Sequence, residues 1–206
     1  MERVSWIDWY LSQARARLLV RVDESFISSP YNLYGIRQKV SHFEAAYELI
    51  RKSCFQPAYT DVSHCPDSYI IEKQAEILYG LIHARYLMTK AAWPQILQKR
   101  EEGVFMRCPR VLCKGTVCIP YGVTDDLLEY PVKMFCPSCS DVYNTDDEDL
   151  SQVDGAFFGS SWMHTYLAAN PGVVPSEKTE AYVPRIYGIK VSYEWDDGHD
   201  DSSTTA

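Results

Sequence analysis

The sequence predicts an α+β fold: an α-helical N-terminal domain, a small ribbon module on an antiparallel sheet, and an extended C-terminal segment. Three observations support this. Apolar residues recur at helical spacing through the first hundred residues, four cysteines stand farther along as two close pairs, and short β-prone runs lie near those pairs. We therefore divide the chain into residues 1–103, 104–168 and 169–206.

The helical domain opens with two start signals. Ser5 and Asp8 predict the start of a first helix, because Ser is a favoured N-cap and an acidic residue suits the first turn. Ser41 and Glu44 have the spacing of a capping box and predict a second helix. Apolar residues of the two helices are Trp6, Trp9 and Tyr10, then Phe43, Ala46, Tyr47 and Ile50.

A longer helix is predicted over residues 67–89, with Asp67 as its cap. A shorter helix over 93–102 accommodates Pro94 in its first turn and is followed by Gly103, a natural terminator. The apolar positions that recur along the longer helix are Ile70, Ile71, Ile77, Leu78, Leu81 and Ile82.

Residues 116–121 and 130–135 are β-prone and predict strands of a small antiparallel sheet. An acidic loop over 146–149 should precede a helix over 154–168, which the sequence Asn-Pro-Gly stops. Residues 182–193 form one more strand-like run. We expect the polar, acidic end of the chain to be disordered.

Four cysteines have the spacing of a metal site. Cys108-x4-Cys113 and Cys136-x2-Cys139 are two short loops that can each donate two thiolates, and 22 residues between them can form the connecting strands. Four sulfurs at about 2.3 Å in a tetrahedron are typical of structural zinc. Because four thiolates leave no open coordination position, the sequence predicts one structural zinc ion per chain in a zinc ribbon and no hydrolytic metal.

Other interpretations of the seven cysteines remain open. A CxxC pair can be a redox dithiol, but such sites follow a strand in a βαβ unit, and the sequence indicates none. Cys118 is a further candidate ligand, although a packed thiol is favoured. Cys54 and Cys65 flank an interhelical loop and could approach each other, although buried or idle thiols are favoured.

Composition narrows the functional classes. No apolar run approaches the ~20 residues that a membrane span requires. The first residues, MERVSW, lack the apolar core of a signal peptide, so we expect a cytoplasmic and nuclear protein with reduced thiols. Residues 1–140 hold 17 Lys/Arg and 15 Asp/Glu, whereas residues 141–206 hold 3 and 13. This acidic second part disfavours nucleic-acid binding and could instead meet a basic partner.

A zinc-ribbon module associated with transcription is the competing interpretation. Within residues 103–143, however, the four basic residues are balanced by four acidic ones, and zinc with four thiolates adds a formal −2. No catalytic motif assembles, so we do not expect an enzyme. For His83, inside the long helix, a hydrogen-bonded core or interface role is favoured over a general base.

Apolar side chains lie beside the predicted metal ligands: Pro109, Val111, Leu112 and Val142. A module this small cannot bury all of them. They could form a protein–protein surface or pack onto the helical domain, and spacing does not distinguish the two.

Several motifs resemble the regulatory beta subunit of casein kinase II. They are EILYGLIHARY from residue 76, CPRV-x-C from 108, CP-x-C from 136, DGAFFG from 154 and VPRIYG from 183. The motifs follow the family order, and the likeness extends over roughly residues 4–191.

This resemblance implies a non-catalytic chain that forms a homodimer mainly through its zinc ribbon, with Pro109, Val111, Leu112 and Val142 at the contact. It further implies a tetramer in which two catalytic serine/threonine kinase subunits flank that dimer. The matching C-terminal segment, around Ile186, Tyr187 and Ile189, would dock the catalytic subunit. The chain would then stabilise the kinase and help to select its protein substrates.

The chain departs from the family pattern at three places. Residues 51–66 contain a single acidic residue, Asp61, where the family has a dense acidic stretch, so we do not expect regulation through that loop. The family's N-terminal serine cluster is missing, with only Ser5 nearby. Ile189 stands where an aromatic residue is typical. Thr145 and Ser151 precede acidic residues and resemble sites that such kinases phosphorylate.

Overall fold

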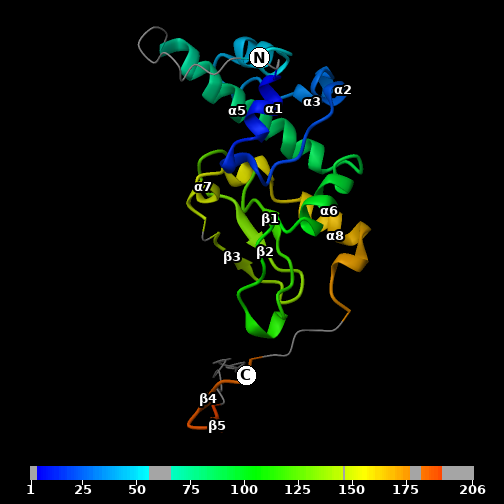
Figure 1. Cartoon of the computed structure of the whole chain (residues 1–206), viewed down its shortest axis with the longest axis vertical. Helices are drawn as coiled ribbons and strands as arrows, with labels where there is room; N and C mark the ends of the chain where they lie inside the picture. Colours follow the sequence, from blue (N-terminus) through cyan, green and yellow to red (C-terminus); the bar gives the residue numbers. More distant parts are fainter. Residues whose placement is uncertain (1–3, 56–65, 146, 177–181, 192–206) are drawn as a thin grey trace, which may run out of the picture.

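The computed structural model describes residues 4–55, 66–145, 147–176 and 182–191. Helices gather at one end of the molecule and a small sheet lies beneath them, as Figure 1 shows. This arrangement confirms the predicted α+β class. Within these ranges, no helix combines the length and apolar character needed to span a bilayer.

A long helix organises the N-terminal part. The described residues of this part form α1 (Trp6–Leu11), η1 (Ala14–Ala16), α2 (Glu24–Ile27), α3 (Pro30–Leu33), α4 (Phe43–Ile50), the long helix α5 (Pro66–Leu87) and α6 (Trp93–Glu101). Of the apolar positions predicted along α5, Leu78, Leu81 and Ile82 are buried and Ile71 and Ile77 are half-buried, whereas Ile70 is 45% exposed. Tyr79 and Tyr86 of the same helix are also buried. Helix α4 packs against this helix and supplies Ala46 and Ile50 to the core.

The chain between η1 and α2 is fastened to α5 by two polar side chains. The Tyr79 hydroxyl donates to the Val20 carbonyl at 2.9 Å and accepts from the Val22 amide at 3.1 Å. His83 Nε2 accepts from the Val20 amide at 3.0 Å. Because this extended segment is buried, its backbone groups would otherwise lack partners, and these bonds satisfy them.

Of the helix starts predicted from the sequence, the cap at Ser5 is confirmed and the caps at Ser41 and Asp67 are wrong. Ser5 caps α1 as predicted, and its Oγ accepts from the Asp8 amide at 3.1 Å. The capping box at Ser41 is wrong: His42 precedes α4 in a left-handed conformation with φ 55°, and the Glu44 carboxylate instead contacts Arg37. Asp67 lies in the first turn of α5 and is not its cap, because the helix starts one residue earlier.

The ribbon contains a three-stranded antiparallel sheet of β1 (Ile119–Tyr121), β2 (Lys133–Phe135) and β3 (Val142–Tyr143), in that order. Its first two strands are shorter than predicted because the flanking residues bond elsewhere. Cys118 donates its amide to Met106 O at 2.9 Å, and Val132 donates to Val153 O at 2.8 Å. The third strand was not predicted.

The predicted helix over 154–168 is wrong. A short turn, η4 (Gly155–Phe157), and a separate helix, α8 (Trp162–Ala169), occupy this region. Gly159 separates them with φ 72°, a conformation that interrupts a right-handed helix, and Asp154 caps the first turn through Oδ1. A final turn, η5 (Pro171–Val173), follows.

The prediction of an acidic loop over 146–149 is also wrong for residues 147–149, the part that the structure describes. Asp147 caps a short helix, α7 (Glu148–Ser151), and its Oδ1 accepts from the amides of Asp149 and Leu150 at 3.0 and 3.2 Å. Asp147 also forms an ion pair with Arg17 at 2.7 Å, which joins the ribbon side to the helical part.

The core runs without interruption from the helices into the ribbon, and one buried cluster contains Trp6, Ile82, Cys118 and Phe158. The ribbon meets the 155–159 segment so closely that a Cβ on Gly122 would lie 2.2 Å from Gly155 O.

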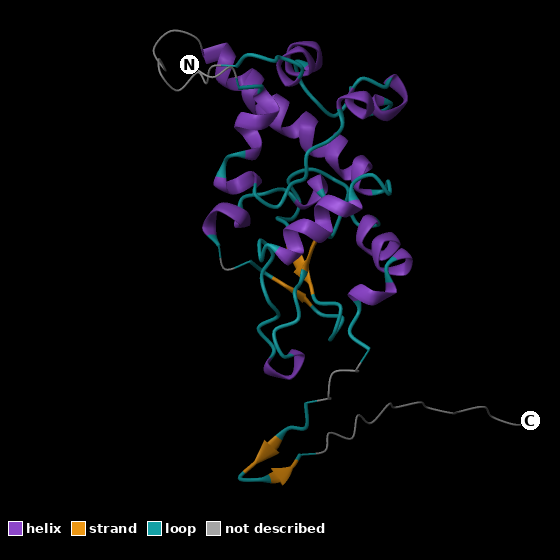
Figure 2. Cartoon of the chain, turned by 45° about the vertical axis from the view of Figure 1, so that its right-hand side comes forward, coloured by secondary structure: helices purple, strands orange, loops and turns teal. Residues whose placement is uncertain are grey.

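Beyond η5, the strand-like run forms a hairpin in place of a single strand. Strands β4 (Arg185–Ile186) and β5 (Ile189–Lys190) pair antiparallel, and Figures 1 and 2 show them apart from the rest of the molecule. Tyr187 and Gly188 have φ 49° and 84°, the positive values that a two-residue hairpin turn requires. The predicted disordered tail, from 192 onward, lies outside the described residues.

Candidate metal centre

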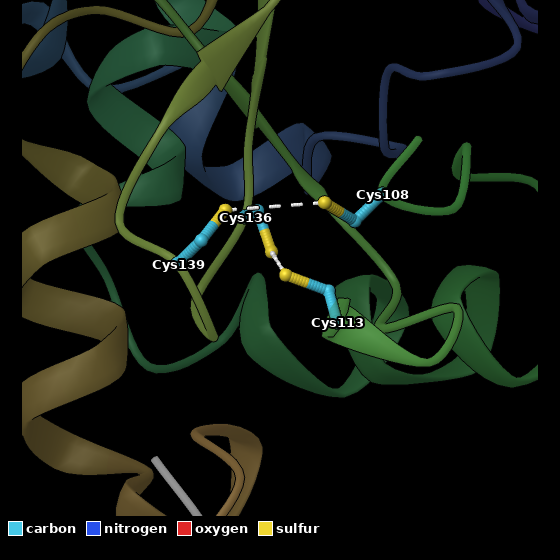
Figure 3. A group of neighbouring side chains, drawn as sticks. All are labelled: Cys108, Cys113, Cys136 and Cys139. Carbon is cyan, nitrogen blue, oxygen red and sulfur yellow. Dashed lines mark hydrogen bonds between the residues drawn. The ribbon is translucent and has the colours of Figure 1, made fainter. Parts of the chain in front are cut away.

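Four sulfur atoms converge in the ribbon. The Sγ atoms of Cys108, Cys113, Cys136 and Cys139 all lie within 4.8 Å of one another (Figure 3). Cys108 and Cys139 are 3.9 Å apart at sulfur, and Cys113 and Cys136 are 4.0 Å apart. Four sulfurs at about 2.3 Å from one ion would be about 3.8 Å from each other, so the group has the dimensions of a tetrahedral metal site.

The first pair of cysteines is held by a tight turn. Cys108 donates its amide to Thr116 O at 2.8 Å, and a 3₁₀ turn, η3 (Val111–Cys113), carries Cys113. Lys114 and Gly115 follow with φ 51° and 75°, so the chain reverses immediately after the second cysteine. This reversal returns the backbone toward Cys108 and brings the two sulfurs onto one side.

The second pair occupies the turn between β2 and β3. Cys136 donates its amide to Asp141 O, and Ser140 donates to Cys136 O, both at 2.9 Å. Ser140 has φ 60°, which turns the chain back into β3. Pro137 within this turn fixes its own φ, as expected from the sequence.

Burial differs among the four cysteines. Cys108, Cys113 and Cys136 are buried, whereas Cys139 is half-buried. Burial raises the pKa of Cys136 far above its usual range, despite hydrogen bonds from the amides of Cys139 and Ser138. Burial also acts to raise the pKa of Cys139, but hydrogen bonds from Tyr143 and the Asp141 amide outweigh it and lower that pKa to about 7. Burial therefore dominates at Cys136, whereas the hydrogen bonds dominate at Cys139.

Of the other cysteines that the structure describes, Cys54 and Cys118, neither joins the group. Cys118 is fully buried, and burial raises the pKa of its thiol to about 12, so the favoured interpretation as a packed thiol is confirmed. Cys54 is exposed, and Cys65 lies outside the described residues. Among the described residues, no second group of potential metal ligands occurs.

His83 has the predicted hydrogen-bonded core role. It is fully buried, its Nδ1 lies 2.7 Å from Phe157 O, and its Nε2 accepts from Val20. The carbonyl can only accept, so the proton resides on Nδ1. Burial lowers the pKa of His83 to about 4. Both ring nitrogens are occupied, which leaves no atom for a general base.

The apolar residues beside the metal group differ in exposure. Val111 is 88% exposed and Val142 45%, Pro109 is exposed, and Leu112 is half-buried. Val111 therefore does not pack onto the helical domain of its own chain. In the C-terminal hairpin, Ile186, Tyr187 and Ile189 are 60%, 101% and 74% exposed.

Sequence reasoning missed Tyr143, whose hydroxyl lies 3.3 Å from the Cys139 sulfur. The strand that carries it is two residues long, too short for an alternating pattern. An aromatic residue four positions after a cysteine is also not a distinctive signal.

Comparison with known proteins agrees with this geometry. A family model described as "Casein kinase II regulatory subunit" matches residues 5–190. The chain is 37% identical over 194 residues to "Casein kinase II subunit beta-2" of Schizosaccharomyces pombe, an alignment that covers 93% of this chain and 75% of that protein. It is 35% identical over 187 residues to "Casein kinase II subunit beta'" of Drosophila melanogaster, covering 91% and 84%.

The protein of the same name in Neurospora crassa, "Casein kinase II subunit beta-2", is 35% identical over 190 residues. That alignment covers 90% of this chain but 64% of the Neurospora protein, so this relative is considerably longer than the chain described here.

Proposed function

Because the chain belongs to the casein kinase II regulatory subunit family, whose members are non-catalytic, we propose that it binds zinc, forms a homodimer and docks catalytic kinase subunits. The observation that carries the proposal is the convergence of Cys108, Cys113, Cys136 and Cys139 within 4.8 Å in a chain that matches the family over residues 5–190.

Zinc fits this donor set for chemical reasons. Four thiolates satisfy a tetrahedral ion completely, and such closed sites stabilise folds. The three strands of the ribbon contain three, three and two residues, which is too little sheet to be stable without further support. Binding energy on the order of 10–16 kcal/mol for such sites would stabilise the ribbon, and no ligand position remains for hydrolytic chemistry.

The patch of Pro109, Val111, Leu112 and Val142 is the proposed dimer contact. These side chains stand on or beside the two cysteine turns, so a bound metal would hold them rigidly. Exposed apolar side chains on a rigid support favour association with a complementary surface, and a second copy supplies the same surface through a two-fold axis. The exposure of Val111 supports this assignment.

The C-terminal hairpin is the proposed docking element for the catalytic subunit. Its turn presents Tyr187 at the tip, flanked by Ile186 and Ile189. A hairpin that pairs with itself has little entropy left to lose on binding, and its three large side chains can fill pockets on a partner. With one kinase per hairpin, the assembly would contain two regulatory and two catalytic chains.

In this assembly the chain would stabilise the active kinase and supply additional surface for selecting protein substrates. We place it in the cytoplasm and nucleus, where thiols remain reduced and available to zinc. Ser151 is exposed in α7 and Thr145 is half-buried, so Ser151 is the more accessible of the two proposed phosphorylation sites. Phosphopeptide mapping after incubation with the holoenzyme tests both, and unmodified peptides would refute them.

The central test combines metal content with mass. The purified chain should contain one zinc per polypeptide and have the mass of a dimer, and adding a catalytic subunit should yield the mass of a tetramer. A folded, metal-free monomer that does not retain the kinase would refute the proposal.

A further inference from the structure

Strand β3 carries an aromatic side chain to the metal group. Tyr143 pairs with Met134 of β2, and Val142 pairs with Phe135, so the register of the sheet fixes where Tyr143 lies. Its hydroxyl is 3.3 Å from Cys139 Sγ, within the range for a hydrogen bond to sulfur. Tyr143 is thus a polar group in contact with a ligand atom, although it is not itself a ligand.

The chemistry of the site decides the direction of this hydrogen bond. A metal-bound cysteine is a thiolate without a proton, so its sulfur can only accept. The tyrosine hydroxyl is protonated at neutral pH and therefore must donate. Hydrogen bonds to ionised acceptors are stronger than those between neutral groups.

The bond is made to the most accessible of the four sulfurs. Cys108, Cys113 and Cys136 are buried, but Cys139 is half-buried and is the sulfur that solvent and protons can reach first. Four thiolates around one divalent ion leave a formal charge of −2. Donors to the sulfurs offset that charge, and the Tyr143 hydroxyl is such a donor to Cys139.

From this arrangement we propose that Tyr143 is a positioning residue of the metal centre, whose hydroxyl donates to the Cys139 thiolate, holds that sulfur in place and slows the release of zinc. The inference rests on the proposed zinc site and names a residue that acts through Cys139. Outer-shell partners of metal ligands typically change metal affinity by about 10-fold to 100-fold. Without the hydroxyl, the Cys139 sulfur would be held less firmly in its position at the ion, and zinc would be released more readily.

Strand geometry separates this role from the proposed dimer contact. Successive side chains of a strand point to opposite faces, so Tyr143 faces Cys139 while its neighbour Val142 faces outward. Removing the Tyr143 hydroxyl should therefore leave the Val142 surface intact. A change in zinc retention without a change in dimer mass would separate the two functions.

The test uses the full chain with Tyr143→Phe, and Tyr130→Phe as a matched control. Tyr130 belongs to the same ribbon, is 49% exposed, and accepts a hydrogen bond from the Gly155 amide at its backbone carbonyl. Zinc transfer to a chromogenic chelator should be about 10-fold to 100-fold faster for Tyr143→Phe than for wild type and unchanged for Tyr130→Phe.

Cobalt substitution supplies a readout that general loosening of the ribbon would not produce. A hydrogen bond lowers the energy of the sulfur lone pairs, so its loss should move the thiolate-to-cobalt charge-transfer band to lower energy in Tyr143→Phe and not in Tyr130→Phe. Unchanged release and an unchanged band would overturn the inference, as would a Tyr143→Phe chain that stays unfolded at saturating zinc. A wild-type chain that binds no zinc would instead overturn the proposed function.

Discussion

Gly80 of α5 lies directly against the ring of Phe157, so closely that a Cβ at position 80 would be 2.2 Å from the ring Cδ1. One turn farther along α5, His83 Nδ1 donates to Phe157 O at 2.7 Å. The helix therefore holds both the side chain and the backbone of Phe157. Because the 155–159 segment also meets the ribbon at Gly122, this contact links the helical part to the metal-binding part.

Gly80→Ala should destabilise the chain, although alanine is normally the better helix former by about 0.5–1 kcal/mol. The added methyl would overlap a buried ring that cannot move freely, and such overpacking costs about 1–3 kcal/mol. Chemical denaturation of the zinc-loaded chain measures the change. In a Phe157→Ala background the same substitution should be neutral or stabilising. A loss of stability in that background would show that the ring is not the obstacle.

His83 should make folding stability fall as the pH falls. Its folded pKa of about 4 lies below the value of about 6.5 for an unfolded histidine, so the unfolded chain binds more protons between these values. The contribution is complete above pH 6.5 and declines by about 3 kcal/mol down to pH 4. Burial, which disfavours the charged imidazolium, is the main cause of this lowered pKa.

The His83 measurement compares wild type with His83→Gln at constant zinc over pH 4–7. Protonation of the cysteine ligands affects both chains alike and cancels in the difference. The stability difference should shrink toward low pH. A difference that does not change with pH would contradict the buried neutral imidazole.

Local sequence rules predicted elements whose ends depend on nearby residues. Ser5 caps α1 because its hydroxyl needs only the amide three residues ahead, and the long helix follows from its apolar repeat. The prediction of one helix over 154–168 was wrong because tertiary contacts fix the first part of this segment. Its first turn is fixed by the Asp154 cap and by contacts with α5 and Gly122, and Gly159 then breaks the repeat.

The four clustered cysteines were predictable because a metal site demands close pairs of cysteines, and that demand is visible in spacing alone. Tyr143 was not, because its position depends on the register between β2 and β3. Similarly, Cys118 could be separated from the ligands only once the strands had placed its sulfur outside the group.

Removing the metal should unfold the ribbon. Cys113→Ala should lose zinc and lose the strand signal in circular dichroism, because three thiolates bind far more weakly than four. Cys118→Ala is the matched control: it removes an equally buried thiol of the same ribbon and should keep one zinc per chain. Metal analysis and dichroism check both. Retention of stoichiometric zinc by Cys113→Ala would contradict the ligand assignment.

Val111→Glu should convert the dimer into a monomer without unfolding it. Val111 is 88% exposed in the single chain, so a charge there costs little stability but would be buried in the proposed contact. Leu128→Glu is the control, since Leu128 is also 88% exposed but lies in the connection between β1 and β2, outside the patch. Light scattering after size exclusion reports the mass. If the Val111→Glu chain remained a dimer, Val111 would not lie in the dimer contact.

Ile189→Phe should tighten binding to the catalytic subunit. Ile189 is 74% exposed beside the hairpin turn, and a phenyl ring there can cover more apolar surface on a partner. If one ring's additional contact is buried, the gain is about 1 kcal/mol, or roughly fivefold in Kd. Ile70→Phe, which adds the same ring on the exposed face of α5, should leave the affinity unchanged. Calorimetric titration compares the two. Equal or weaker binding by Ile189→Phe would mean that the hairpin does not bury this position against the kinase, because a larger apolar group in a real contact must change the affinity.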